Sequence, residues 1–254
     1  MQKKNPNKKT GRKLAPDQRI YNDMMIGVID SGIGGLTVLA PLLKRKCADR
    51  YLYLADGANM PYGNKSKDEL CDIALANVKT LAERGANAIV FACNTLSVCT
   101  LETVRKETAL PLFGLIPRPE LTFGNALMVT TPATGSYLPP LPKKTALLTP
   151  ARLAALIDGN YPDLKGVQSY LRPLLVPYED VDCVYLGCSH YLLAKEVFGR
   201  LLPHAKLLDG ATPLASLVQA VLPPVLVKKE SVDFLFTGKD ETARYCSILS
   251  SLLA

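Results

Sequence analysis

The chain has 254 residues, of which 48% are hydrophobic and 21% charged, a balance typical of a globular protein that excludes a fibrous or disordered one. No apolar run reaches the roughly 18 residues that a membrane span needs, and no signal-peptide core is visible, so we expect a cytoplasmic protein. The net charge of +7 comes mostly from residues 1–22, which carry seven basic side chains against one acid. We predict a disordered tail there, and no nucleic-acid partner.

The cysteines form no pattern that indicates disulfides or zinc. There are seven, an odd number, and none belongs to a Cys-x-x-Cys pair. Only two histidines, His190 and His204, are available as further metal ligands. We therefore expect reduced thiols and no metal site.

Short apolar runs alternate with helical patterns along the chain, an order that favours parallel strands joined by crossover helices. The apolar runs are continuous, which indicates strands buried on both faces of an α/β sheet. Strands are predicted at residues 25–29, 51–55, 88–92, 126–129, 183–186 and 234–236. Helices are predicted at residues 36–46, 67–84, 96–108, 192–202, 213–221 and 240–253, and a proline-rich loop at residues 138–143.

The ends of the predicted strands carry the polar residues of interest, because open α/β sheets bind ligands at the carboxyl ends of their strands. The first strand leads into Asp30-Ser31-Gly32-Ile33-Gly34-Gly35 and then a helix. This is neither the dinucleotide fingerprint nor a phosphate loop, since Thr37 replaces the third glycine and the lysine is missing. The glycines fit either an anion held by backbone amides or a tight turn capped by Ser31.

Two later strands end in matched ways, each with a cysteine followed by polar side chains. Cys93 precedes Asn94-Thr95, and Cys188 precedes Ser189-His190. A lone cysteine is usually a small buried hydrophobe, and we interpret the other five in that way. A thiol in a polar setting at two strand ends favours a shared site instead.

Two thiols suit proton transfer at an unactivated carbon, because inversion needs a base on one face and an acid on the other. The ordinary cysteine pKa of about 8.5 lets a nearby charge produce thiolate near neutral pH. Asp30 is the neighbour available to assist Cys93, and His190 the one available to Cys188.

Taken together, the motifs resemble those of the glutamate racemases, in the aspartate/glutamate racemase superfamily, over about residues 25–254. The segments that carry the resemblance, in the family's order, are Asp30-Ser31-Gly32-Ile33-Gly34-Gly35, Asp56 to Pro61-Tyr62-Gly63, Cys93-Asn94-Thr95, Thr131-Pro132-Ala133-Thr134 and Gly187-Cys188-Ser189-His190-Tyr191. The resemblance implies a pseudosymmetric α/β fold of two lobes, each a mostly parallel sheet flanked by helices, with the active site at their interface. The first lobe would comprise residues 23–114 and 208–254, and the second residues 115–207.

The resemblance further implies interconversion of L- and D-glutamate without a cofactor or metal, supplying D-glutamate for peptidoglycan synthesis. Cys93 and Cys188 would be the acid/base thiols, with Asp30 and His190 supporting them. The substrate-binding residues would be Ser31, Tyr62, Gly63, Asn94, Thr95, Thr131, Thr134 and Ser189. The expected partner is then a small amino acid, and neither a nucleic acid nor a membrane is expected to bind. The protein could also form a homodimer, which the resemblance does not decide.

The chain departs from the family's pattern at two positions within the motifs. Gly57 follows the aspartate that precedes Pro-Tyr-Gly, where the family has serine or threonine. Ser189 replaces a threonine but keeps the hydroxyl.

A third departure concerns a glutamate that the family places in a Pro-Leu-Val-Glu-like segment, where it supports the second thiol. Matching residues 169–174 to the helix before the second cysteine strand makes Leu147-Leu148-Thr149-Pro150 the shortened counterpart and leaves no glutamate. Matching Val176-Pro177-Tyr178-Glu179 restores one but deletes a helix. We favour the first alignment, which predicts a shortened second lobe and an incomplete polar network around Cys188.

Other functions remain open at this point. A relative that keeps the pocket as a non-catalytic binding or regulatory protein is one, and a racemase for another acidic amino acid such as aspartate is another. Deuterium uptake from solvent at the α-carbon would separate them, because either racemase exchanges that proton and a binding protein does not.

Overall fold

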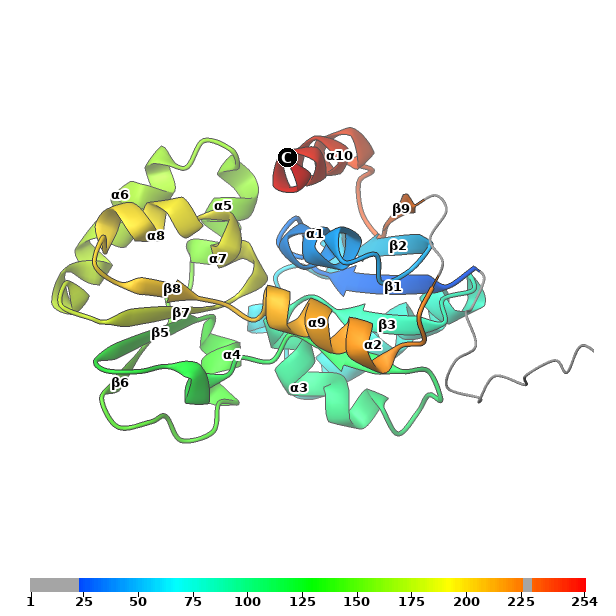
Figure 1. Ribbon diagram of the computed structural model, residues 1–254, viewed down its shortest axis with the longest axis horizontal. Coiled ribbons are helices and arrows are strands. Elements are labelled where there is room, and N and C mark those ends of the chain that lie inside the picture. The colour runs from blue at the N-terminus through cyan, green and yellow to red at the C-terminus, as the bar shows by residue number, and fades with distance from the viewer. Residues whose placement is uncertain (1–22, 226–229) are drawn as a thin grey trace, which may run out of the picture.

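A computed structural model describes residues 23–225 and 230–254 (Figure 1), so the predicted tail at residues 1–22 lies outside the described residues. The described chain contains two parallel sheets with helices packed against them. In spatial order, the first sheet consists of β4 (Leu112–Gly114), β3 (Ala88–Phe91), β1 (Met25–Asp30), β2 (Arg50–Ala55) and β9 (Ser231–Phe236). The second consists of β6 (Thr145–Leu148), β5 (Ala126–Thr130), β7 (Cys183–Gly187) and β8 (Lys206–Leu208). The predicted α/β class is confirmed.

The helices divide between the two sheets. Around the first sheet lie α1 (Leu36–Lys44), α2 (Lys67–Glu83), α3 (Asn94–Val104), α9 (Ala211–Val221) and α10 (Thr242–Leu253). Around the second lie α4 (Pro132–Ser136), α5 (Leu153–Asn160), α6 (Lys165–Leu175), α7 (Ser189–Leu193) and α8 (Lys195–Leu201). Short 3₁₀ turns are η2 (Gly57–Asn59), η3 (Tyr62–Asn64), η4 (Pro119–Leu121) and η5 (Val176–Tyr178).

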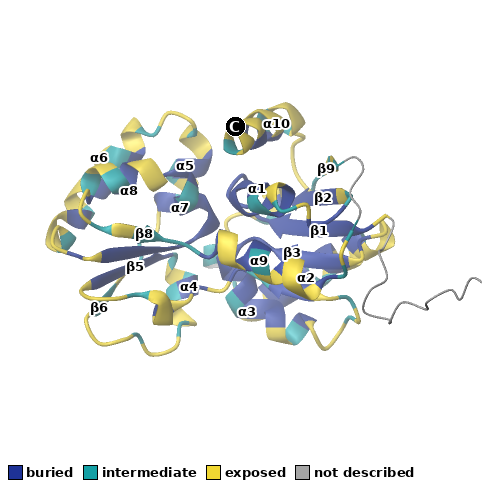
Figure 2. Cartoon of the chain, in the orientation of Figure 1, coloured by how far each residue is buried: buried dark blue, intermediate teal, exposed yellow. Residues whose placement is uncertain are grey.

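The central strand β1 shows why its sequence is continuously apolar. Ile26 and Val28 belong to the apolar cluster formed with α1, α9 and α10, whereas Met25 and Ile29 belong to the cluster formed with α2 and α3. Successive side chains of a strand point to opposite faces, so both faces of the sheet are covered. The first of these clusters continues into the second sheet and α5–α8, which gives the two sheets a shared apolar core, dark blue in Figure 2.

All six predicted strands are present, and the three that were not predicted, β4, β6 and β8, lie at sheet edges. An edge strand has one neighbour instead of two and needs no long apolar run, so its sequence signal is weak. The loop at residues 138–143 is confirmed. The division into lobes at residues 114/115 and 207/208 stays a prediction.

The predicted helices are present, with one break and two omissions. The single helix predicted at residues 192–202 is in fact two, α7 and α8, which meet at Ala194 without a proline or glycine to mark the break. Sequence patterns did not predict α4 or α5, and α6 was expected only from the family alignment, which kept a helix at residues 169–174. Tyr161-Pro162 closely follows α5 and Pro173 lies inside α6, which interrupts the helical pattern of that region.

Gly27 in β1 offers a test of this packing, because a Cβ atom there would lie 2.8 Å from Cδ1 of Leu81 in α2. Gly27→Ala should lower the free energy of unfolding by roughly 1–3 kcal/mol, the usual cost of overpacking a core, as measured by urea denaturation. Gly166→Ala is the matched control, since that exposed α6 position has open space around it. The control should be neutral or stabilising by up to about 1 kcal/mol, and equal losses for both variants would contradict the packing described.

Candidate active site between the two sheets

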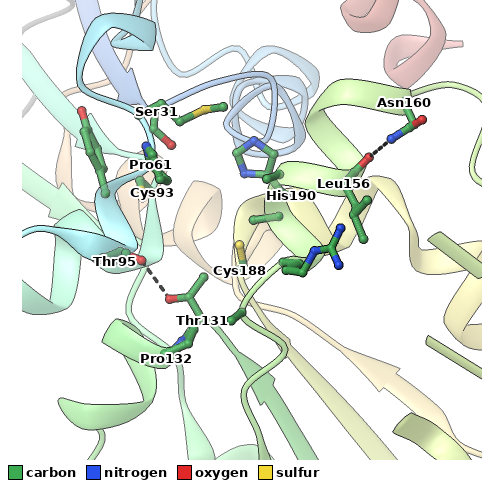
Figure 3. A pocket seen from close by; sticks show the side chains of 17 residues that line it. Ser31, Pro61, Cys93, Thr95, Thr131, Pro132, Leu156, Asn160, Cys188 and His190 are labelled. Atoms are coloured by element: carbon green, nitrogen blue, oxygen red, sulfur yellow. Dashed lines mark hydrogen bonds between the residues drawn. The ribbon is translucent and has the colours of Figure 1, made fainter. Parts of the chain in front are cut away.

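A cavity of about 410 Å³ lies among the strand ends of the two sheets (Figure 3). Its volume falls in the range of about 300–1,000 Å³ that is usual for small-molecule sites. Strand ends of the first sheet and the loop before η3 supply one wall, and the segment from Ala151 to Asn160 supplies much of another. The lining residues are Ser31, Met60, Pro61, Tyr62, Gly63, Cys93, Thr95, Thr131, Pro132, Ala151, Arg152, Ala154, Ala155, Leu156, Asn160, Cys188 and His190.

Both cysteines at the matched strand ends line this cavity. Cys93 follows β3 and is the N-cap residue of α3, and Cys188 follows β7 and is the N-cap residue of α7. In Figure 3 Cys93 lies beside Pro61, and Cys188 lies across from it, below His190. The two sheets therefore each contribute one thiol to the same space.

The environment of Cys93 favours a protonated thiol. Burial raises the pKa of Cys93 well above its usual value, and the negative charge of Asp30 raises it further. The backbone N–H groups of Leu96 and Thr95 oppose this effect without cancelling it. At neutral pH Cys93 therefore carries its proton.

Asp30 lies at the end of β1 and is fully buried outside the cavity wall. It accepts a hydrogen bond from the Gly32 N–H at 2.9 Å and another from the Ser189 hydroxyl at 3.0 Å. Burial raises the pKa of Asp30, although the charge of His190 and these hydrogen bonds oppose the shift. Asp30 thus joins the end of the first sheet to the segment that carries Cys188.

His190 is buried next to Cys188 and makes a strong contact with Asp158, whose Oδ2 lies 2.8 Å from its Nε2. Burial opposes a charge on the imidazole, but hydrogen bonds to Asp158 and Cys188 and the charge of Asp30 hold the pKa of His190 well above its usual value. His190 is therefore an imidazolium at neutral pH.

Asp158 corrects the expectation that the polar network around Cys188 is incomplete. Burial alone would raise the pKa of Asp158, but its hydrogen bond to His190 and the imidazolium charge bring the pKa below the usual value. The favoured alignment was right to keep a helix at residues 169–174, where α6 lies, and wrong to leave no supporting carboxylate. One signal was available, since Asp158 is the only acid in residues 145–160, but it is an aspartate where the family has a glutamate.

The glycines after β1 make room for the His190–Asp158 pair. A Cβ atom at Gly32 would collide with Oδ2 of Asp158, and one at Gly34 would lie 2.7 Å from the Ser189 hydroxyl oxygen and equally close to the His190 backbone nitrogen. Ser31 does not cap α1, whose N-cap residue is Gly35, so the capped-turn interpretation was wrong. The motif instead presents bare backbone to the residues that follow β7.

Three threonine hydroxyls join the two halves of the site. Thr95 in α3 lies 3.0 Å from Thr131 and 3.1 Å from Thr134, measured between hydroxyl oxygens, and Thr131 donates to Thr134 at 2.9 Å. Thr131 is also the N-cap residue of α4 and accepts a hydrogen bond from the Thr134 N–H. Figure 3 shows the bond between Thr95 and Thr131 at the cavity wall.

The loop that carries Tyr62 and Gly63 is held by a buried carboxylate, Asp56. Its oxygens accept hydrogen bonds from the Tyr62 hydroxyl at 2.7 Å and the Thr237 hydroxyl at 2.6 Å. The side-chain amides of Asn59 and Asn77 also donate to Asp56. At Gly57, where the family has a hydroxyl, an added Cβ atom would meet nothing within 4 Å, so nothing in the described chain fills that position.

Most predicted site residues meet at the cavity, and some lie behind it. Those that line it are Ser31, Tyr62, Gly63, Cys93, Thr95, Thr131, Cys188 and His190. Asp30, Asn94, Thr134 and Ser189 are buried but do not line it. The Asn94 amide nitrogen donates to the Leu115 carbonyl at 2.8 Å, while its Oδ1 is buried without a hydrogen-bond partner among the described residues.

Sequence reasoning missed the wall that α5 forms, including Arg152, Leu156 and Asn160. No helix was predicted there, so no side chain could be assigned to a face. In the described ranges, no group of three or more His, Cys, Asp or Glu side chains is arranged to hold a metal ion. None of the helices described is long and apolar enough to cross a membrane.

Comparison with known proteins agrees with the geometry. No family model matches the chain. The glutamate racemase of Persephonella marina is 33% identical over 235 residues, covering 85% of this chain and 86% of that protein. The glutamate racemase of Campylobacter concisus is 34% identical over 205 residues, covering 74% and 78%. A solved Thermus thermophilus glutamate racemase in complex with β-chloro-D-alanine superposes with a TM-score of 0.74 at 29% identity, covering 92% of this chain and 94% of that one.

The fold and these relatives define an amino-acid racemase, an isomerase that acts on amino acids. More narrowly, the chain belongs to the glutamate racemase family. A Campylobacter jejuni glutamate racemase has the same fold, with a TM-score of 0.76 at 20% identity over 91% of this chain and 98% of that one.

The His190–Asp158 pair can be tested by NMR, because the chain has only two histidines and exposed His204 serves as an internal reference. Asp158 raises the pKa of His190, so Asp158→Asn should lower it, and the imidazolium should be lost at a lower pH than in the parent protein. The imidazole resonances titrated in both proteins measure the shift. An unchanged His190 titration would show that the carboxylate does not control the imidazole.

Proposed function

We propose that this protein interconverts L- and D-glutamate by a two-thiol mechanism in which Cys93 and Cys188 act on opposite faces of the α-carbon. The observation that carries the proposal is that these two cysteines, from two different sheets, line one cavity of small-molecule size. The alternative of a non-catalytic binding protein loses support, since the carboxylate thought to be missing from the Cys188 side is present as Asp158.

The proton balance is simple. A thiolate on one cysteine takes the α-proton, which leaves a carbanion delocalised into the α-carboxylate. The thiol on the opposite face then donates its proton to the same carbon. The product has the inverted configuration, and the two cysteines have exchanged protonation states, which exchange with solvent restores.

The two thiols have different electrostatic surroundings. Asp30 and burial keep Cys93 as the thiol, whereas Cys188 lies beside His190. We propose that Cys188 is the base in one direction of the reaction, with Cys93 as the acid. The reverse direction starts after a proton has moved from one cysteine to the other.

Arg152 supports an acidic substrate. It is the only Lys, Arg, Asp or Glu among the described residues that line the cavity, and no ion pair to its guanidinium occurs within the described chain. Glutamate carries two carboxylates and one ammonium group, so its net charge is negative. We propose that Arg152 attracts the second carboxylate of the substrate to the cavity.

We propose further that the protein works in the cytoplasm and that its D-glutamate serves peptidoglycan synthesis. These proposals follow from the family, whose named members are glutamate racemases. We propose no nucleic-acid partner. Whether the protein forms a homodimer can be decided by measuring its mass in solution.

Replacing either cysteine separates the two half-reactions. Cys93→Ser and Cys188→Ser should each lower racemisation by about 10²–10⁴-fold, the usual contribution of one acid/base group. With 3-chloroglutamate, abstraction of the α-proton and loss of chloride need one base only, so each variant should still eliminate chloride from one enantiomer. The two variants should prefer opposite enantiomers. Chiral chromatography and chloride release measure the two reactions, and preference of both variants for the same enantiomer would exclude the two-base arrangement.

Arg152→Met should raise the KM for glutamate by about tenfold, which corresponds to roughly 1.4 kcal/mol and is in line with loss of one charge-assisted contact. Binding of the uncharged analogue glutamine, measured as competitive inhibition, should change little, because it lacks the second carboxylate. Solvent deuterium uptake into glutamate and aspartate in the same assay ranks the two substrates. An unchanged KM for both acids would remove Arg152 from substrate recognition.

A further inference from the structure

Arg244 in the C-terminal helix α10 contacts Asp158 at two points. Its Nη2 donates a hydrogen bond to the main-chain carbonyl of Asp158, and its Nη1 lies 3.5 Å from Oδ1 of the side chain. The other carboxylate oxygen, Oδ2, lies 2.8 Å from Nε2 of His190 and accepts a hydrogen bond from the Ile33 N–H at 3.2 Å. The two oxygens of one carboxylate are therefore divided between His190 and Arg244.

The position of Asp158 explains why a second cation is needed there. It lies two residues before the end of α5, where main-chain carbonyls lack intrahelical donors and the helix dipole disfavours an anion. Its side chain is also only 12% exposed, which adds a desolvation cost to its charge. A planar guanidinium can bind a carbonyl and a carboxylate at once, so Arg244 meets both demands.

We propose that Arg244 is a positioning residue for racemisation, which holds the Asp158 carboxylate against His190 and through that pair supports Cys188. The inference rests on the proposed role of Cys188. Arg244 is 31% exposed and also pairs with Glu241 at 3.1 Å, so it acts mainly by fixing the orientation of Asp158. α10 is anchored by buried Tyr245, Ile248 and Leu249, which holds Arg244 beside Asp158.

Other charged and titratable groups face the His190–Asp158 pair and limit how far the loss of Arg244 can change the pKa of His190. On the His190 side these are Asp30 from β1 and Cys188, and both raise the pKa of the imidazole. On the Asp158 side, Glu241 and Tyr245 of α10 lie near Arg244, and the Arg244 charge lowers the pKa of Asp158. Loss of the Arg244 charge by itself would favour the imidazolium, so a lower pKa of His190 in a variant would report the lost orientation of Asp158 and not the lost charge.

The test compares Arg244→Gln with Arg105→Gln in the full chain. Arg105 is a close match, because it also pairs with a glutamate three residues earlier, Glu102, and donates to a main-chain carbonyl, that of Leu112, but these contacts do not involve Asp158. NMR titration of His190, with His204 as reference, gives a readout that does not depend on activity. We expect a lower His190 pKa in Arg244→Gln and no change in Arg105→Gln.

Elimination of chloride from the two enantiomers of 3-chloroglutamate gives the second readout, since each enantiomer uses one cysteine as base. In Arg244→Gln, kcat/KM should fall about tenfold for the enantiomer that depends on Cys188, a fraction of the full acid/base contribution of about 10²–10⁴-fold. The other enantiomer should be affected much less. Arg244→Lys keeps the charge but not the two-point contact. It should recover part of the lowered His190 pKa and part of the lost kcat/KM.

Equal losses for the two enantiomers, or an unchanged His190 titration, would reduce Arg244 to a structural role and overturn the proposal. If Arg244→Gln does not fold, the titration of Arg244→Lys decides, because the weaker hold should still lower the His190 pKa. Failure of the underlying mechanism gives a different result, namely racemisation that survives in Cys188→Ser.

Discussion

The site depends on one contact, the packing of the His190–Asp158 pair against the bare backbone of the loop after β1. The pair comes from the layer of the second sheet, and the loop from the first. Since Gly32 and Gly34 carry no side chain, His190, Ser189 and Asp158 approach closely enough for the Ile33 N–H to donate to the carboxylate. This contact joins the loop after β1 to the residues beside Cys188, next to the cavity that both thiols line.

The two cysteines occupy matched places in the fold but different electrostatic surroundings. Each is the N-cap residue of the helix that follows its strand. Cys93 lies near the carboxylate of Asp30, and Cys188 lies beside the imidazolium of His190. Because the Ser189 hydroxyl donates to Asp30, the anion on one side and the cation on the other belong to one buried network. One thiol is therefore kept protonated while the other has a cation beside it.

Segments far apart in the chain hold this network in place. Asp56 binds Tyr62 and also Thr237, which follows β9, so the loop at the cavity depends on the edge of the first sheet. α5 supplies both the cavity wall and Asp158, and Arg244 near the C-terminus secures Asp158 from the other side. The walls of the site are thus tied to the shared apolar core, which spans both sheets.

The sequence by itself determined the buried strands, the matched cysteines and the family, because continuous apolar runs and residues that directly follow them leave local patterns. The edge strands, α5 and the role of Asp158 were decided only by tertiary structure. An aspartate at a helix end looks like any solvated acid in sequence, and its partners His190 and Arg244 are 32 and 86 residues away. Only the packing of both sheets shows that Gly32 and Gly34 are small to admit that pair, since the contact that excludes a Cβ atom comes from the other half of the molecule.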